Sequence, residues 1–476
     1  YSTMIKAEIV ELLDLIDNSL ALEGTDAIIK NRTVLQANIH KLAEISSLGS
    51  GTRQGYARYL IRLAAIAFGA FPASIHVLYM ARGRGEIPHT FTVPALNLRM
   101  MSFDTARAVF RAAKAISGGA FIFEIARSEI GYTDQRPAEY ASSILAAAIA
   151  EGYTGPVFIQ GDHFQVSAKR YADNPDAELN ALRELIKEAI AAGFYNIDID
   201  ASTLVDISKP TVAEQQTVNC SLSAMFSEYI RAHQPAGLTI SIGGEIGEVG
   251  GHNSTEEELC AYMGGYRLEL QRLSPQSVGL SKISIQTGTS HGGVVLPDGS
   301  IAQVNVDFKT LLNLSRVSRS AFQMGGAVQH GASTLPEDAF NKFVESEAIE
   351  VHMATNFQNM VYNQLPEDLK AEMYAYLDIK SAAERKPGMT DEQFYYKTRK
   401  NAIGPFKAQT WHLPEDVKEG IAKELESQFA RLFNSLGIRN TRRFVDQTIH
   451  PLVIKPSAKF FLGGLAGDED VSDLAD

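Results

Sequence analysis

PVFIQGDHFQ (156–165) joins a strand-like apolar run to an Asp-His pair, and two later segments repeat this arrangement. KISIQTGTSHGG (282–293) and AVQHGAS (327–333) also run from β-branched residues into a histidine beside glycine or small residues. The pattern places each histidine at the C-terminal end of a strand. The histidines can meet only if the three strands share one sheet or barrel, and three converging imidazoles form a site for a divalent metal ion. They are His163, His291 and His330.

Eight strand-like runs follow one another through the middle of the chain, separated by amphipathic or alanine-rich stretches that favour helices. Alternating strands and helices over roughly 270 residues match the usual size of an α/β protein with a (β/α)8 TIM barrel, whose active sites lie at the C-terminal strand ends. The expected strands are TFTVPALN (90–97), AFIFEIA (120–126), PVFIQGD (156–162), YNIDID (195–200), LTISIGGE (238–245), KISIQTG (282–288), AVQHG (327–331) and IEVHMAT (349–355).

The 476 residues exceed what one hydrophobic core usually holds, so we expect extensions on both sides of the barrel. Apolar residues at helical spacing predict an N-terminal helical extension over residues 1–89. The barrel is expected over 90–365 and a charged, helical C-terminal extension over 366–476, ending in an acidic tail that we expect to be disordered. The apolar helix faces at 5–16 and 418–433 need a partner, which is either the barrel or a second subunit.

Composition restricts the classes of partner. Apolar residues make up 45% and charged residues 21%, as in soluble globular proteins, and the net charge is −12. Without a basic stripe, nucleic acid is not expected as a partner. Two cysteines are too few for a disulfide scaffold, and neither a run of about 18 apolar residues nor a signal-like N-terminal pattern is present. We therefore expect a cytoplasmic protein without a membrane partner.

Four motifs in this region resemble those of the class II, metal-dependent fructose-bisphosphate and tagatose-bisphosphate aldolases. The resemblance covers about residues 90–360 and implies reversible aldol cleavage of a phosphorylated ketose such as fructose 1,6-bisphosphate, through a metal-stabilised enediolate. It implies Zn2+ or another divalent ion such as cobalt or manganese, a monovalent cation as a further cofactor, and a role in glycolysis or gluconeogenesis. The motifs are GDHFQ (161–165), GGEIGEVGG (243–251), TGTSHGG (287–293) and QHGAS (329–333).

The resemblance also implies roles for individual residues. His163, His291 and His330 would bind the metal, and Asp162 would transfer the proton of the substrate hydroxyl. Glu245 would be a further catalytic carboxylate beside the metal, and carboxylates in this position orient the imidazoles. The residues implied in binding the substrate and its phosphate are Asp200, Gly292, Gly331, Ser333, Thr355 and Asn356.

The chain departs from the family pattern in two places. The family's eighth strand reads Asn-x-Asp-Thr-Asp, whereas this chain has HMATN (352–356) and retains only the threonine. In the family's mobile loop acids follow Gly-Gly directly, whereas here His252 follows and the acids come later, at 256–258. We expect those acids to form the first turn of a helix capped by Ser254 or Thr255. His252 is the candidate for the missing proton-transfer group.

Other functions stay open at this stage. GTSHG (288–292) fits the G-x-S-x-G elbow of serine hydrolases, but an elbow leads directly into a helix, and GGVVLPDGS follows here. A non-catalytic aldolase-like subunit or scaffold, or another metal-dependent lyase or hydrolase on the same barrel, would keep the fold. We also expect a homo-oligomer, either a dimer or a tetramer.

Overall fold

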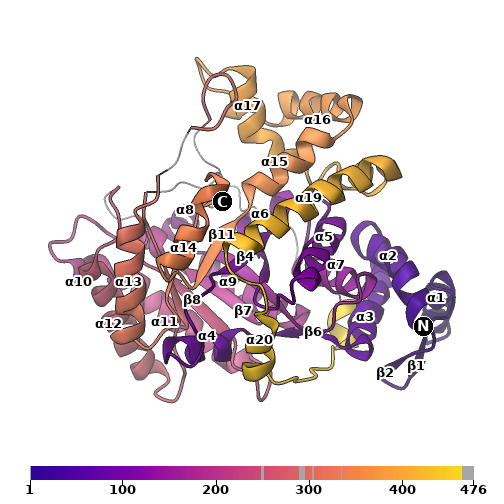
Figure 1. Ribbon diagram of the computed structural model, residues 1–476, viewed down its shortest axis with the longest axis horizontal. Helices are drawn as coiled ribbons and strands as arrows, with labels where there is room; N and C mark the ends of the chain where they lie inside the picture. The colour runs from indigo at the N-terminus through magenta and orange to yellow at the C-terminus, as the bar shows by residue number, and fades with distance from the viewer. Residues whose placement is uncertain (1, 248–250, 289–294, 303–304, 334, 464–476) are drawn as a thin grey trace.

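Eight parallel strands close into a barrel in the computed structural model, which describes residues 2–247, 251–288, 295–302, 305–333 and 335–463. Neighbours along the chain pair in sequence, and the last strand pairs with the first. Every predicted strand is present, which confirms the TIM barrel (Figure 1). The strands are β4 (Val93–Asn97), β5 (Ile122–Ala126), β6 (Gly155–Gln165), β7 (Asn196–Asp200), β8 (Ser241–Glu245), β9 (Lys282–Ile285), β10 (Ala327–Gln329) and β11 (Glu350–Met353).

Helices between the strands cover the barrel, and their sequences show why they form. In α9 (Pro175–Ala192), Leu182, Leu185, Ile186 and Ala189 recur at helical spacing and are buried. The Asn174 side chain caps its first turn. The other helices of the barrel are α5 (Ser102–Ala115), α6 (Arg127–Tyr132), α7 (Pro137–Ala150), α8 (Ala168–Asp173), α10 (Val212–Gln215), α11 (Thr217–His233), α12 (Glu256–Leu273), α13 (Phe308–Ser320), α14 (Asn341–Glu345) and α15 (Thr355–Gln364).

The chain before the barrel contains short strands that the sequence analysis missed. The hairpin of β1 (Leu20–Glu23) and β2 (Asp26–Ile29) precedes α2 (Arg32–Leu48) and α3 (Gly51–Phe68), and β3 (Ala70–Ala73) pairs in parallel with the start of β6. Helices α2 and α3 cover the side of α7 that faces away from the barrel. Helix α7 is therefore buried on nearly all sides, which explains its alanine-rich, apolar sequence. The remaining helices here are α1 (Ser2–Leu15) and α4 (His76–Gly83).

The chain after the barrel is helical. The long helix α19 (Glu415–Ser435) packs on α5 and α15; Phe429 contacts Phe357 of α15 and Phe433 contacts Phe121, so its apolar face is covered within the same chain. The boundaries at 89/90 and 365/366 and the homo-oligomer stay predictions, and the acidic tail, GDEDVSDLAD (467–476), lies outside the described residues. No helix in the described ranges has the length and apolar character needed to span a membrane. The C-terminal helices are α16 (Glu367–Lys380), α17 (Asp391–Thr398), α18 (Lys407–Trp411), α19 (Glu415–Ser435), α20 (Arg442–Thr448) and α21 (Ala458–Leu462).

Helix α12 begins as the sequence predicted. The Thr255 hydroxyl accepts a hydrogen bond from the Glu258 backbone N–H at 3.1 Å, and the Glu258 carboxylate accepts one from the Thr255 N–H at 3.0 Å. This capping box places the three acids of residues 256–258 in the first helical turn, where the positive end of the helix stabilises them.

Replacing Thr255 with alanine should therefore destabilise the start of α12 by about 1 kcal/mol. Hydrogen exchange of the amides of residues 256–259 should accelerate, while the rest of α12 keeps its protection. Thr217→Ala is the matched control, because Thr217 is an exposed helix residue whose hydroxyl donates to the Ala213 carbonyl and caps no N–H. Equal protection of the first turn in Thr255→Ala and the control would contradict the assigned cap.

Candidate functional site

The Asp162–His163 pair lies where strand β6 is irregular. The pairing of β6 with β7 shifts register between Gly161 and Phe164, and His163 has a φ of 38°. Successive side chains of a regular strand point to opposite faces, but a bulge redirects one of them. The bulge therefore lets two consecutive residues, 5% and 4% exposed, reach one side of the barrel mouth. A β-carbon on Gly161 would lie 2.5 Å from the Phe164 ring, so this local packing requires glycine.

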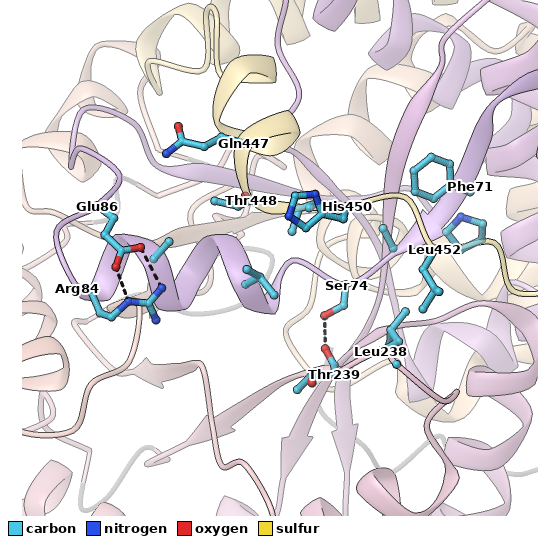
Figure 2. Close-up of a pocket in the computed structure, with 16 residues that line it drawn as sticks. Phe71, Ser74, Arg84, Glu86, Leu238, Thr239, Gln447, Thr448, His450 and Leu452 are labelled. Atoms are coloured by element: carbon cyan, nitrogen blue, oxygen red, sulfur yellow. Dashed lines mark hydrogen bonds and ion pairs between the residues drawn. The ribbon is translucent and has the colours of Figure 1, made fainter.

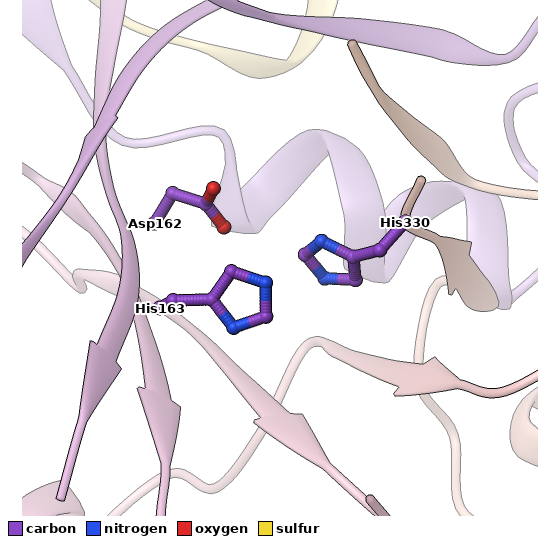
Figure 3. Close-up of side chains that lie close together, drawn as sticks. All are labelled: Asp162, His163 and His330. Carbon is purple, nitrogen blue, oxygen red and sulfur yellow. The ribbon is translucent and has the colours of Figure 1, made fainter. Parts of the chain in front are cut away.

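His330 meets this pair from the other side of the barrel. It follows β10 directly, and its ring centroid lies 4.4 Å from that of His163. One ligand atom each from Asp162, His163 and His330 lies within 4.8 Å of the others, and Figure 3 shows the carboxylate and both rings directed toward one another. The Ser284 hydroxyl lies 2.9 Å from His330 Nε2. The predicted third histidine, His291, and Gly292 lie outside the described residues.

Two further carboxylates orient His163. Its Nδ1 lies 3.1 Å from Asp200 Oδ2 and 3.5 Å from Glu245 Oε2. Asp200 is itself fixed by hydrogen bonds from the Ser202 hydroxyl at 2.6 Å and the Gln165 amide at 2.7 Å. When Nδ1–H donates to Asp200, Nε2 carries the lone pair that a metal ligand needs.

The electrostatics of this group suit a cation. Burial alone lowers the pKa of His163, but the charges of Asp162 and Glu245 and the hydrogen bond to Asp200 raise it well above the ordinary value. Burial raises the pKa of Glu245 to about 8, and the charge of Asp200 contributes. The raised pKa of His163 reflects the neighbouring negative charge, and that of Glu245 reflects mainly burial. The donors present, two imidazoles and neighbouring carboxylates, therefore fit a bound divalent metal ion.

A small cavity opens beside the group and contains three of the six residues predicted to bind the substrate and its phosphate, Gly331, Ser333 and Thr355. Ser333 Oγ accepts hydrogen bonds from the backbone N–H groups of Ala354 and Thr355, so it caps α15. Asn356 does not line the cavity and contacts Met360 instead. The residues that line the cavity are Asn97, Arg99, Glu124, Asp162, His330, Gly331, Ser333, His352, Met353, Ala354 and Thr355.

Arg99 is a cavity residue that the sequence analysis missed. It forms an ion pair with Glu129 at 2.7 Å and lies 3.3 Å from the Gln358 side chain, and it is 7% exposed. The sequence does contain a feature that could have pointed to Arg99. Two polar residues, Asn97 and Arg99, alternate with Leu98 at the C-terminal end of β4. Such alternation is what a strand produces when one face lines a polar site.

His252 is not part of the metal-binding group in this structure. Its side chain is 54% exposed, and its Nδ1 lies 2.7 Å from the Asn253 carbonyl oxygen. The candidate serine elbow lies mostly outside the described residues. The segment that follows it, 295–302, forms a turn closed by a Val295–Ile301 bridge rather than the helix that an elbow requires.

A larger cavity of about 380 Å3 lies at the other end of the barrel (Figure 2). It is lined by Phe71, Leu238 and His450, and its charged residues Arg84 and Glu86 pair with each other at 2.8 Å. Within the described ranges, the groups of side chains able to hold a metal include none of its lining residues. Since TIM-barrel chemistry occurs at the C-terminal strand ends, the smaller cavity beside His330 is the candidate active site.

Comparisons with known proteins identify a family and a fold. Residues 87–435 match the model of the family described as "Fructose-bisphosphate aldolase class-II". The chain is 29% identical over 135 residues to the D-tagatose-1,6-bisphosphate aldolase subunit GatZ of Escherichia coli O139:H28, a match that spans 27% of this chain and 31% of the relative.

Two crystal structures share the fold. A probable tagatose 6 phosphate kinase from Sinorhizobium meliloti 1021 aligns with a TM-score of 0.52 and 15% identity, over 75% of this chain and 97% of its own. The fructuronate-tagaturonate epimerase UxaE from Cohnella laeviribosi aligns with a TM-score of 0.50 and 12% identity, over 91% of this chain and 99% of its own. At these identities the likeness extends to architecture alone.

Proposed function

The chain belongs to the class II fructose-bisphosphate aldolase family, and from this premise we propose that it is a zinc-dependent aldolase that reversibly cleaves a phosphorylated ketose. The observation that carries the proposal is the convergence of Asp162, His163 and His330 at the barrel mouth. His163 and His330 would hold the ion together with His291. When bound, the ion would stabilise the negative charge that develops on the substrate oxygens as the carbon–carbon bond breaks.

Asp162 is the residue we propose for removal of the substrate hydroxyl proton. Burial on its own raises the pKa of Asp162, but the imidazoles of His163 and His352 lower it well below the ordinary aspartate value. The carboxylate is therefore ionised, as a base must be. As its proton leaves, the hydroxyl becomes the aldehyde of one product, and the electrons of the broken bond remain on the other product. The carbon of this second product that carries the electrons then takes up a proton, and His252 remains the proposed donor of that proton.

Arg99 and the start of α15 support a phosphorylated substrate. An arginine guanidinium presents several N–H donors to phosphate oxygens, and a helix N-terminus carries partial positive charge. Arg99, Gly331 and Thr355 line the cavity that contains Asp162 and His330. We propose that the phosphate binds here, with the Ser333 hydroxyl donating to it while Ser333 continues to cap the helix.

A second candidate function is that of a non-catalytic aldolase subunit. It is favoured by the description of the curated relative as an aldolase subunit and by the changed eighth strand, HMATN (352–356). The match covers about a third of that relative, so its substrate and its assembly come to this chain as proposals only.

Metal removal separates the two candidates. The full chain would be assayed with fructose 1,6-bisphosphate and tagatose 1,6-bisphosphate, and with fructuronate and tagaturonate, the sugars named for the Cohnella epimerase. We expect cleavage of a bisphosphate that falls at least about 100-fold after chelation and recovers when Zn2+ is added, because the metal stabilises developing charge. Unchanged cleavage by metal-free protein would contradict the proposed mechanism. Bound metal without turnover of any of these sugars would favour the subunit.

A further inference from the structure

A second group of buried ionisable side chains lies inside the barrel, beside the candidate metal centre. It comes from five strands, β5, β6, β7, β9 and β11, and every member is at most 6% exposed. Charged side chains are almost never buried this deeply unless they are paired or bind an ion. We call this group the inner cluster; it consists of Glu124, Asp162, Asp198, Lys282, Glu350 and His352.

His352 occupies the centre of the inner cluster. Its Nδ1 lies 2.9 Å from Glu124 Oε1 and 3.3 Å from Asp162 Oδ1, and its Nε2 contacts Glu350 and lies 4.0 Å from Asp198 Oδ2. One ligand atom each from Glu124, Asp162, Asp198 and His352 lies within 4.8 Å of the others. Four donors gathered in this space have the spacing of ligands around one ion.

Several of these donor atoms lack a hydrogen bond. The approaches of Glu124 Oε1 and Asp162 Oδ1 to His352 Nδ1 are close but poorly directed. Asp198 Oδ1 faces the Lys282 ammonium, but among the described residues Asp198 Oδ2 accepts no hydrogen bond. The side-chain oxygen of Asn97, a residue 3% exposed that lines the same cavity, also has no hydrogen-bond donor. An unsatisfied buried polar atom destabilises the fold, so several in one place indicate a missing ligand.

The charges of the inner cluster do not balance. Lys282 Nζ lies 2.9 Å from Asp198 Oδ1 and 2.6 Å from Glu350 Oε2. Even with His352 protonated, four carboxylates face two cations within the cluster. The cluster therefore holds an excess of buried negative charge, which a bound cation would offset.

The backbone leaves room for this arrangement. A β-carbon on Gly243 of β8 would lie 2.3 Å from Asp198 Oδ1 and 2.8 Å from Lys282 Cε. The side chains of β7 and β9 therefore meet across β8 because β8 has glycine at that position.

We propose that Glu124, Asp162, Asp198 and His352 bind a second divalent cation beside the His163–His330 metal centre. Asp162 would contribute Oδ1, the oxygen that faces His352, and keep Oδ2 for the substrate proton. Two ions on either side of Asp162 would lie close together, as in two-metal sites. Three carboxylates and one imidazole suit Mn2+ or Zn2+. The second site is an addition to the proposed aldolase activity. Its occupancy can be measured whether or not the protein turns over a substrate.

Metal stoichiometry tests the second site. The metal-free chain of residues 1–476 would be dialysed to equilibrium against Mn2+, and bound metal would be measured by atomic emission. We expect two ions per wild-type chain and one in each of Glu124→Gln, His352→Asn and His330→Asn. His76→Asn is the control, because His76 is a buried histidine outside both groups, and this variant should bind two ions. Two ions in Glu124→Gln and His352→Asn would overturn the proposal.

The wild-type protein offers a test that does not depend on folding of the variants. Electron paramagnetic resonance of the Mn2+-loaded chain should show the exchange-coupled spectrum of a metal pair. A single uncoupled ion at saturating Mn2+ would overturn the second site and leave the inner cluster as a proton-neutralised ion-pair network. That result would not affect the proposed aldolase activity, which requires only the His163–His330 centre.

Discussion

Asp162→Asn should lower kcat by about 100- to 10,000-fold, the usual contribution of a positioned general acid or base. The amide has nearly the shape of the carboxylate but cannot accept the hydroxyl proton, so substrate binding should change little and the loss should appear in kcat rather than KM. His163 and His330 remain in this variant, so it should retain the metal ion that they hold. Steady-state kinetics on zinc-loaded protein, with metal content measured in the same samples, would check both expectations.

Asp200→Asn is the matched comparison, because it makes the same chemical change on the neighbouring strand. Asp200 contacts His163 Nδ1 at 3.1 Å and acts through the orientation of that ring. Residues in this position typically change metal affinity by about 10- to 100-fold. Asp200→Asn should therefore need more Zn2+ for half-maximal activity and recover much of its rate at saturating metal. If excess Zn2+ restored Asp162→Asn to the same degree, Asp162 would not be the proton-transfer residue.

The barrel could be predicted because its strands are short apolar runs bounded by turn residues. The strands β4 to β11 are almost entirely buried, and β4 and β5 read as nearly continuous apolar stretches, whereas β7 and β11 alternate charged with apolar residues. The strands β1 to β3 have four residues each and lack this signal. β3 reads AFPA and directly follows the apolar helix α3, so the two merge into one apolar stretch in the sequence.

The candidate site was predictable where a motif ended a strand, as with His163 and His330. The inner cluster as a whole was missed: Asp162 was predicted from its motif and His352 was named only as a departure from the family pattern, whereas the other members lie within strands and outside any motif. Glu124 in AFIFEIA and Asp198 in YNIDID each carry a signal, since a charge inside a buried strand requires a partner. Which charged side chains contact one another depends on the order and register of the strands. The sequence does not specify these, and the structure does.

A buried ion pair fixes the strand end that carries the site. Arg127 of α6 and Glu178 of α9 form two hydrogen bonds of 2.9 and 3.0 Å, and neither side chain has measurable exposure. Arg127 also donates to the Gln165 carbonyl at 2.7 Å, and Glu178 accepts from the Ser167 N–H. The pair thus connects two helices to the end of β6, a few residues after Asp162 and His163.

Glu178→Gln should destabilise the protein by about 3–5 kcal/mol, because it leaves the Arg127 guanidinium buried without its counter-charge. The midpoint of urea unfolding should fall, and occupancy of the metal centre should fall with it, since β6 loses its anchor. Replacing both partners, in Arg127→Met with Glu178→Leu, should recover much of the stability because no charge stays buried. Glu86→Gln is the control, since it breaks the exposed Arg84–Glu86 pair and should leave the midpoint nearly unchanged. An equally small shift in Glu178→Gln would mean that water reaches Arg127, and that packing rather than this ion pair holds the end of β6.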